Sequence, residues 1–388
     1  MVTTADLPAT PAARERLFAD LTTDLATLDN RGRRRALHPA RGIDFTSNDY
    51  LGLARSPRLA AAVADAIARG VAIGSGGSRL LRGNDPEHEA LEAAAATWAG
   101  SEAALFLSSG FAANGAIFAT LPQRGDLVVH DSLVHASTLD GLRLSRGQAV
   151  AGGHNDPTRI DDELKRWRNA GGRGRPWIAV ESLYSMDGDR APLEMLLAVA
   201  DRHDAALVID EAHATGVFGE KGRGLAAGLD GRHNVITLRT CGKAMGCEGA
   251  LLFSPAIVRD FIVNRGRSFI FSTAPSPLMA CAVRESLRIL VDEPDRRDRL
   301  GELVSAAQSA FAPLGINTTG TQIVPIIVGD NARTMAIAAA LQARGFDVRG
   351  IRPPTVPQGT ARLRVSLTLN VTAERIFDLA DALGQLMR

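Results

Sequence analysis

Cysteine is scarce in this chain of 388 residues, which contains only Cys241, Cys247 and Cys281. Three cysteines at this spacing provide neither a disulfide framework nor a set of metal ligands, so we expect no metal site and a reducing compartment, the cytoplasm. Long apolar runs are absent too, which argues against a membrane-spanning helix. The formal net charge is +1, which gives no electrostatic basis for nucleic acid or an anionic membrane as the main partner.

Lysine is equally scarce, because only three of the 44 basic side chains are lysines. Lys165 lies in a charged segment that is typical of the exposed face of a helix, and Lys221 lies in a glycine-rich loop. Lys243 differs from both, since it follows the apolar run 235–240 and has small neighbours. Such a lysine can attack a carbonyl group, but most lysines are simply solvated. The residues alone leave both interpretations open.

A second apolar run, 205–209, ends at Asp210 and is followed by His213. In an open α/β sheet functional groups gather at the carboxyl ends of the strands, where Asp210 and Lys243 would both lie. A lysine that forms a Schiff base and an acid that holds a pyridinium nitrogen are what pyridoxal 5′-phosphate chemistry requires. The alternative for Asp210 is an ordinary turn residue or helix cap.

Apolar runs alternate with helical patterns over most of the chain, which is long enough for two domains. Near-continuous apolar strands with helices between them indicate a mostly parallel sheet covered on both faces. The expected strands are 103–109, 126–131, 177–181, 205–210, 235–240 and 249–253, and the expected helices between them are 112–121, one that follows His135, 157–170 and 192–203.

The pattern changes after about residue 275, where two helices are followed by shorter strands and helices. The stretch 361–369 alternates strictly between apolar and polar residues, which predicts an antiparallel strand with one face in water. We therefore expect an α/β protein with an N-terminal helical segment (1–45), a large α/β domain (46–275) and a smaller α+β C-terminal domain (276–388).

We expect no secretory signal in the N-terminal segment, because Met1–Pro11 lacks an apolar core. Leucines then recur at helical spacing, which predicts an amphipathic helix that packs on another surface. These leucines are Leu17, Leu21, Leu25 and Leu28, and the basic cluster Arg31–Arg35 follows them.

Seven short stretches, taken together and in order, resemble the α-oxoamine synthases, which are pyridoxal 5′-phosphate enzymes of fold type I. No single stretch is decisive, but their order along nearly the whole chain is. Within this family, the resemblance implies the decarboxylative condensation of L-alanine with a pimeloyl thioester, carried by coenzyme A or acyl carrier protein, in biotin biosynthesis. The stretches are Ser47–Leu53, Ser109–Phe111, His135–Ser137, Ser185–Asp189, Asp210–His213, Thr240–Lys243 and Arg352–Pro357.

The resemblance assigns catalytic roles to four side chains by position. Lys243 would bind the cofactor covalently and later move the α-proton of the substrate. Asp210 would pair with the pyridine nitrogen, so that the ring can accept electrons. His213 would form a hydrogen bond to the phenolic oxygen, and His135 would stack on the ring. The alternative for each histidine is a purely structural role.

The anionic phosphate of the cofactor requires donors. Gly110 and Phe111, at the start of an expected helix, offer backbone amides and the helix dipole. The hydroxyl of Thr240 would add another donor. Ser272 and Thr273 match positions that reach the phosphate of the neighbouring subunit in this family, so we expect a homodimer.

Three further polar residues resemble active-site contacts. Ser185 matches a cofactor contact and Asn48 a substrate contact, with Glu181 as an additional candidate. Glu211 stands where an Asp-Asp pair can occur in the family. Because neighbouring residues of a strand point to opposite faces, we expect no loss of chemistry from this difference.

Two basic residues resemble substrate-binding arginines. Arg352 matches the arginine that binds the carboxylate of the amino acid, a role that suits its bidentate guanidinium, and Thr355 belongs to the same stretch. Arg35 aligns with an arginine near the acyl substrate, but the run 33–35 leaves the register open.

Other functions remain as alternatives. Glycine C-acetyltransferase, 5-aminolevulinate synthase and serine palmitoyltransferase share nearly all of these stretches. A non-catalytic cofactor-binding module is disfavoured by the complete set of catalytic side chains. A nucleotide-binding oxidoreductase is disfavoured because Gly74–Ser78 lacks the dinucleotide fingerprint, so we interpret this stretch as a tight passage near a ligand or a subunit contact.

Overall fold

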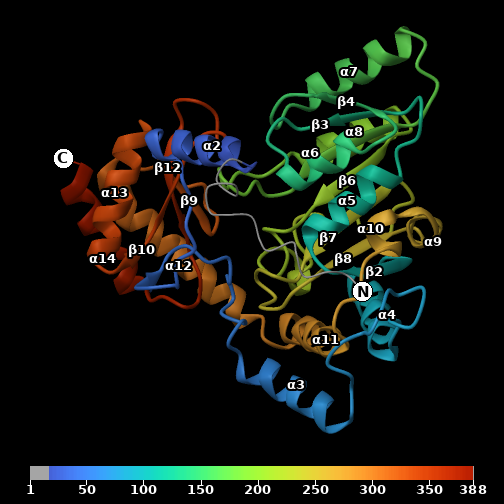
Figure 1. The fold of residues 1–388 in the computed structure, drawn as a ribbon, viewed down its shortest axis with the longest axis horizontal. Helices are drawn as coiled ribbons and strands as arrows, with labels where there is room; N and C mark the ends of the chain where they lie inside the picture. Colours follow the sequence, from blue (N-terminus) through green and yellow to red (C-terminus); the bar gives the residue numbers. More distant parts are fainter. Residues whose placement is uncertain (1–16, 388) are drawn as a thin grey trace, which may run out of the picture.

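The computed structural model describes residues 17–387, so the prediction for Met1–Pro11 lies outside the described part. A seven-stranded sheet in the order β2-β8-β7-β6-β5-β3-β4 forms the centre of the larger body (Figure 1). Only β8 runs antiparallel to its neighbours, so the predicted mostly parallel sheet is confirmed. The strands are β2 (Ala103–Leu107), β3 (Leu127–His130), β4 (Gln148–Ala151), β5 (Pro176–Glu181), β6 (Ala206–Asp210), β7 (Val235–Thr240) and β8 (Ala250–Ser254).

Helices cover both faces of this sheet, because alternate strand residues supply apolar side chains to opposite sides. One face packs on α5 (Gly110–Thr120), α6 (Ala136–Arg143), α9 (Ala256–Arg265) and α10 (Arg267–Ile270). The other face packs on α7 (Pro157–Asn169) and α8 (Leu193–Arg202), and further along on α4 (Pro86–Ala99) and α11 (Pro277–Asp292). The sequence analysis did not predict β4, α4, α9 or α10.

The start of α5 matters for the site. Ser109 caps this helix, since its hydroxyl accepts a hydrogen bond from the backbone N–H of Ala112 at 3.1 Å. The first amides of an α-helix have no partner within the helix. Those at the start of α5 follow β2 directly, so they lie at the carboxyl end of that strand.

The smaller body contains a three-stranded antiparallel sheet in the order β11-β12-β9 (Figure 1). Helix α11 packs on α3 (Pro57–Ala68) and α4, whereas α12 (Asp295–Phe311) packs on α14. We therefore propose the division into 46–275 and 276–388 with α11 as the bridging element. The elements of the smaller body are β9 (Ile323–Gly329), α13 (Asn331–Ala343), β10 (Phe346–Asp347), β11 (Arg349–Ile351), β12 (Ala361–Ser366) and α14 (Ala373–Met387).

The prediction that one face of the stretch 361–369 lies in water is wrong. Every residue of β12 is buried, because β9 and β11 flank it and its polar face turns toward the larger body. Arg362 contacts Asp187, and Arg364 donates to the backbone carbonyl of Ser185 at 2.6 Å. The polar face of this strand is therefore an internal surface beside the loop 182–190.

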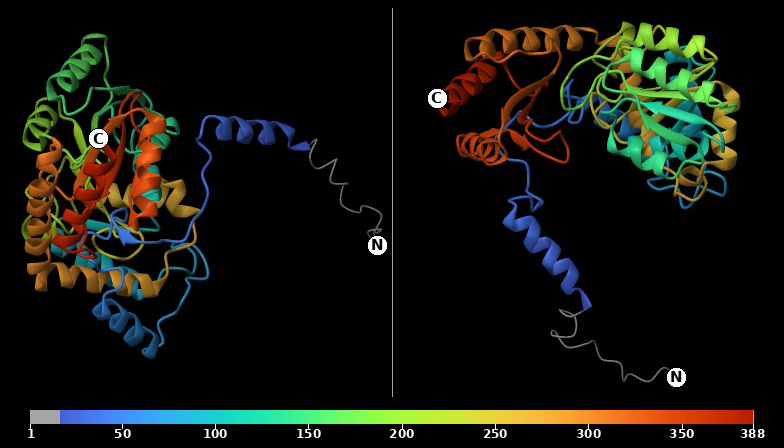
Figure 2. Two further views of the ribbon diagram at one scale, coloured as in Figure 1. Left: turned by 90° about the vertical axis from the view of Figure 1, so that its left-hand side faces the viewer. Right: turned by 90° about the horizontal axis from the view of Figure 1, so that it is seen from above.

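The N-terminal helix α2 (Ala19–Asn30) projects away from both bodies (Figure 2). None of its residues is buried, and Leu21 and Leu25 are 55% and 42% exposed. Further along, β1 (Ile43–Asp44) pairs in parallel with β10 in the smaller body. Across residues 17–387, no helix is both long and apolar enough to span a membrane.

Candidate active site at the carboxyl edge of the central sheet

Three neighbouring strands end at the same edge of the sheet and supply the polar centre of the site. Glu181 is the last residue of β5 and lies beside Asp210, the last residue of β6. Thr240 ends the next strand, β7, and Lys243 follows it by three residues. The parallel pairing of β5, β6 and β7 therefore brings these side chains to one edge.

Lys243 lies among charged groups and is only partly exposed. Burial lowers the pKa of Lys243, Asp210 and Glu181 act to raise it, and Arg364 lowers it. A lowered pKa enlarges the neutral fraction of the amine, which is the nucleophilic form. By contrast, Lys165 and Lys221 are more than half exposed and form ion pairs with Asp161 and Glu220.

Asp210 is held in place by two donors and is 9% exposed. Its Oδ2 accepts a hydrogen bond from Nδ2 of Asn114 at 2.9 Å, and its Oδ1 accepts one from the backbone N–H of Ala212 at 2.9 Å. Asn114 also donates to Oγ of Ser137 at 3.0 Å, and that hydroxyl lies 2.7 Å from Nδ1 of His135. A buried network thus connects Asp210 with His135, which precedes α6.

The sequence analysis missed Asn114. A buried asparagine inside the otherwise apolar helix α5 is the signal that could have revealed it.

The pKa of His135 lies below its ordinary value. Desolvation lowers this pKa most, Asp210 acts to raise it, and Lys243 lowers it further. The lowered pKa favours the neutral form of the His135 ring.

His213 is buried and faces Tyr50, a residue that the sequence analysis also missed. Nδ1 of His213 lies 2.6 Å from the hydroxyl of Tyr50, which is 2.9 Å from Oδ1 of Asn48. Burial, and then the charges of Lys243 and Arg364, hold the pKa of His213 well below its ordinary value. The imidazole is therefore neutral, with Nδ1 engaged by Tyr50.

Arg364 is the most informative residue that the sequence analysis missed. It is 7% exposed, and its guanidinium donates to the carbonyl of Ser185, to Oγ of Ser366 and to Oδ1 of Asn48 at 2.6, 2.6 and 3.1 Å. None of these partners carries a charge, and no acid within residues 17–387 forms an ion pair with it. Because a buried cation without an anion is costly, an anionic ligand belongs here.

The residues expected at the phosphate come together in part. A Cβ atom added to Gly110 would lie 3.7 Å from Oγ1 of Thr240, so the start of α5 faces that hydroxyl. Phe111 follows in the same turn and is 54% exposed. Ser272 and Thr273 lie at the surface, in a shallow hollow beside the end of β2 and the first turn of α5.

Within residues 17–387, no hydrogen bond or ion pair joins the remaining predicted substrate residues to the Lys243 cluster. Arg352 contacts the backbone carbonyl of Gly32 in the N-terminal segment. Thr355 and Arg35 are exposed at the surface. Their predicted roles at the substrate stay predictions.

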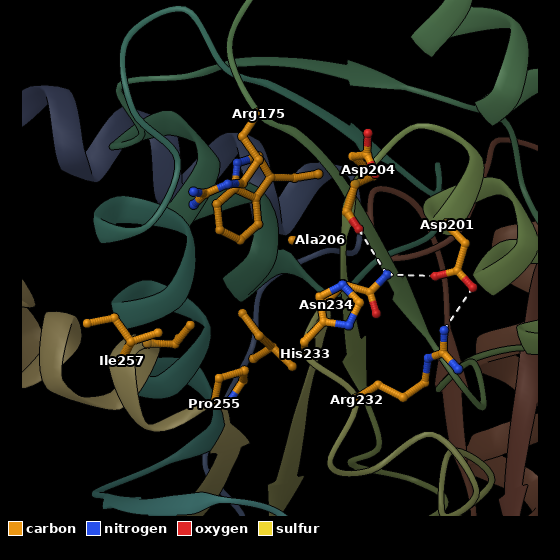
Figure 3. Close-up of a pocket in the computed structure, with 13 residues that line it drawn as sticks. Arg175, Asp201, Asp204, Ala206, Arg232, His233, Asn234, Pro255 and Ile257 are labelled. Carbon is orange, nitrogen blue, oxygen red and sulfur yellow. Dashed lines mark hydrogen bonds and ion pairs between the residues drawn. The ribbon is translucent and has the colours of Figure 1, made fainter.

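A separate hollow of about 550 Å³ lies at the opposite edge of the sheet (Figure 3). Its lining residues come from the amino ends of β5, β6 and β7, the end of α8 and the start of α9, whereas Lys243 follows the carboxyl end of β7. The polar groups on one side of it pair with each other, since Asp201 accepts from Arg232 and Asn234 at 2.8 and 2.9 Å. It is therefore no part of the site around Lys243.

The Lys243 cluster fits pyridoxal 5′-phosphate. It supplies a lysine with lowered pKa for the aldehyde, a fixed carboxylate for the pyridine nitrogen and a neutral imidazole for the phenolic oxygen. The start of α5 beside Thr240 provides amides and a hydroxyl for a phosphate.

Comparison with known proteins agrees with this geometry. Residues 40–383 match the model of the family "Aminotransferase class I and II". The 8-amino-7-oxononanoate synthase of Anaeromyxobacter dehalogenans is 42% identical over 380 residues, which cover 94% of each chain. That of Geobacter sulfurreducens is 44% identical over 327 residues, which cover 83% of this chain and 82% of the other.

Solved structures show the same fold. The serine palmitoyltransferase of Sphingomonas wittichii is 27% identical, with a TM-score of 0.87 and 98% coverage of both chains. The 8-amino-7-oxononanoate synthase of Francisella tularensis is 26% identical, with a TM-score of 0.76 and coverage of 89% and 97%. The chain belongs to the aminotransferase class I and II family and, within it, to the α-oxoamine synthases, which use pyridoxal 5′-phosphate.

Proposed function

We propose that this chain condenses L-alanine with a pimeloyl thioester, releasing carbon dioxide and the free carrier and giving 8-amino-7-oxononanoate in biotin biosynthesis. The observation that carries the proposal is the position of Lys243 and Asp210 at one edge of the sheet, where Asp210 acts on the pKa of Lys243, in a chain 42% identical to an 8-amino-7-oxononanoate synthase over nearly its full length. We also propose a cytoplasmic location, which the three free thiols support.

Pyridoxal 5′-phosphate, when bound, supplies an electron sink for the charge that develops at the α-carbon of the amino acid. Lys243 would hold the cofactor covalently and then carry the α-proton, a task that its lowered pKa favours. Asp210, oriented by Asn114 and Ala212, would keep the pyridine nitrogen protonated.

The two histidines would orient the ring. The hydroxyl of Tyr50 donates to Oδ1 of Asn48, which can only accept, so Nδ1 of His213 donates to the oxygen of Tyr50. This contact fixes the ring of His213, which would form its hydrogen bond to the phenolic oxygen of the cofactor through Nε2. His135, fixed through Ser137, would stack on the ring face.

We propose a homodimer in which Ser272 and Thr273 reach the phosphate of the neighbouring subunit. Two segments beside them lie side by side, since Oγ of Ser276 donates to the carbonyl of Ile73 at 2.6 Å. Large apolar side chains on these segments are exposed to solvent, which is typical of subunit contacts. Sedimentation of the holoenzyme as a fully active monomer would contradict this proposal. The exposed side chains are Ile73 (76%), Leu80 (50%), Leu81 (86%) and Phe271 (71%).

Arg364 would bind the carboxylate of the amino acid. We expect Arg364→Lys to raise KM for L-alanine and to lower kcat/KM about 10- to 100-fold, since a charge-assisted hydrogen bond is worth about 1.5–3 kcal/mol. Steady-state kinetics at varied alanine concentration measures this effect. Arg352→Lys is the matched control, because Arg352 contacts a backbone carbonyl and lies at the surface. A loss confined to Arg352→Lys would assign the carboxylate to Arg352 instead.

The substrate pair is tested by turnover. We expect kcat/KM with a pimeloyl thioester to be far higher for L-alanine than for glycine or L-serine. A single methyl group discriminates by only about 1–3 kcal/mol in an apolar pocket, so binding alone decides nothing. Turnover is informative because the acyl chain adds interactions that the correct pair uses in the transition state.

The product assay should cross alanine, glycine and serine with pimeloyl, acetyl, succinyl and palmitoyl thioesters. Presenting the pimeloyl group on coenzyme A and on acyl carrier protein identifies the carrier. A preference for serine with palmitoyl thioester, or for glycine with a short acyl chain, would assign a sister activity. Either outcome would leave the role of Lys243 intact.

A further inference from the structure

His154 lies between two carboxylates in the loop that follows β4. Its Nδ1 is 3.0 and 3.2 Å from the two carboxylate oxygens of Asp131, and its Nε2 is 2.8 Å from Oδ2 of Asp189. Ionised carboxylates only accept hydrogen bonds, so both ring nitrogens must donate. The geometry therefore requires the protonated, cationic form of His154.

Asn155 reinforces the same arrangement. Its backbone N–H donates to Oδ2 of Asp131 at 2.6 Å, and its Nδ2 donates to Oδ2 of Asp189 at 2.6 Å. The backbone of Asn155 is left-handed, with φ of 49°, a conformation that asparagine tolerates better than most residues. The ring of Tyr184 meets His154 edge-on, with centroids 4.5 Å apart. His154 and Asn155 thus both contact each of the two acids.

The two acids belong to different loops, and both loops border the Lys243 site. Asp131 follows β3 and begins the turn that ends at His135, and its Oδ1 accepts from the N–H of Leu133 in that turn at 2.8 Å. Asp189 belongs to the loop 182–190, which carries Ser185. The backbone carbonyl of Asp189 accepts from the N–H of Tyr184 at 3.0 Å. His154 therefore connects the segment of His135 with the segment of Ser185.

We propose that His154 is a positioning residue that, together with Asp131 and Asp189, locks the His135 turn and the Ser185 loop at a fixed separation around the cofactor. It does not itself touch the reacting groups. The inference rests on the proposed function, in which His135 stacks on the ring and Ser185 contacts the cofactor. A shift of about 1 Å in a positioned group can cost about 10² in rate, so such a lock has a measurable consequence.

Charge and environment support this role. Burial lowers the pKa of His154, but the hydrogen bonds from its ring to Asp131 and Asp189 outweigh this effect and raise the pKa to about 10. The contacts from His154 and Asn155 in turn lower the pKa of Asp131, although burial alone would raise it. Since the ordinary pKa of histidine is about 6.5, the ion pair stabilises the fold fully below about pH 6.5, as long as both carboxylates are ionised. This stabilisation declines as the pH rises and is lost above about pH 10.

The test uses the holoenzyme of His154→Gln, with His203→Gln as a matched control. His203 also contacts a carboxylate, since its Nε2 lies 2.7 Å from Asp161, but it lies at the opposite end of the sheet, just before β6 begins. Three quantities should be measured: the Kd of the cofactor by visible absorbance, the circular dichroism of the bound cofactor, and the Tm of the apoprotein.

We expect His154→Gln to weaken cofactor affinity about 10- to 100-fold and to change the visible circular dichroism. His203→Gln should lower Tm but leave both cofactor signals within twofold of the wild type. If His154→Gln fails to fold, Asp189→Asn tests the same lock, because its side chain is 34% exposed and tolerates change more readily. If His154→Gln and Asp189→Asn both fold, the variant that carries both substitutions should bind the cofactor as tightly as the weaker-binding single variant does.

Wild-type cofactor Kd and circular dichroism in a folded His154→Gln variant would overturn the inference and leave His154 with a purely structural role. Failure of the proposed function gives a different pattern. The wild type would then lack turnover of alanine with pimeloyl thioester, while cofactor binding would still respond to His154→Gln. The two outcomes are therefore distinguishable.

Discussion

Replacement of Lys243 by alanine is expected to abolish covalent attachment of the cofactor and to lower kcat by about 10⁴-fold, the upper range for loss of a proton-transfer group. The reason is that Lys243 would both bind the cofactor and move the α-proton. Neither Lys165 nor Lys221 can replace it, since each forms an ion pair with another acid. Borohydride reduction of the holoenzyme followed by peptide mapping should place the cofactor label on Lys243 alone.

Two natural controls accompany this experiment, because the chain has only three lysines. Lys165 and Lys221 are 53% exposed and pair with neighbouring acids. Lys165→Ala and Lys221→Ala should therefore retain the label and near wild-type turnover. A label on either of these lysines would show that the chemistry lies elsewhere.

The second large effect is expected from Asp210→Asn. This variant should still bind the cofactor, because Lys243 and the start of α5 are unchanged. It should lose about 10² to 10⁴ in the rate of α-proton exchange, since a neutral amide cannot keep the pyridine nitrogen protonated. Exchange of the α-hydrogen of L-alanine in deuterated water, followed by NMR, measures this step without the acyl substrate.

Glu211→Gln is the matched control for Asp210→Asn. Glu211 follows Asp210 but points away from the site, where its Oε1 accepts from the N–H of Ala226 at 3.1 Å. Burial raises the pKa of Glu211 to about 7, so glutamine resembles its neutral form. We expect near wild-type exchange in this variant. Near wild-type exchange in Asp210→Asn would mean that another acid, such as Glu181, holds the pyridine nitrogen.

The sequence by itself determined the architecture of the larger body and the edge of the sheet where the chemistry lies. Near-continuous apolar runs can be buried only in a sheet covered on both faces, and the parallel strands then end at one edge. Asp210 and Lys243 both follow such runs. The sequence pattern alone therefore predicts that both side chains lie at this edge, without information on contacts between distant segments.

Only the tertiary structure decided what covers a polar face. Alternation along 361–369 indicated that two faces differ, but it could not tell whether the polar face meets water or another part of the protein. In the fold that face meets the loop 182–190, which buries Arg364, and no acid in the described part of the chain forms an ion pair with it.

The same limit applies to Asn114, to His154 and to the N-terminal helix. The roles of Asn114 and His154 depend on partners far along the chain. These partners are Asp210, 96 residues from Asn114, and Asp189, 35 residues from His154. Leucines at helical spacing predicted α2 but not the surface that it covers, and the described chain buries none of its residues. Local patterns specify which side chains share a face, whereas the packing of distant segments decides what that face contacts.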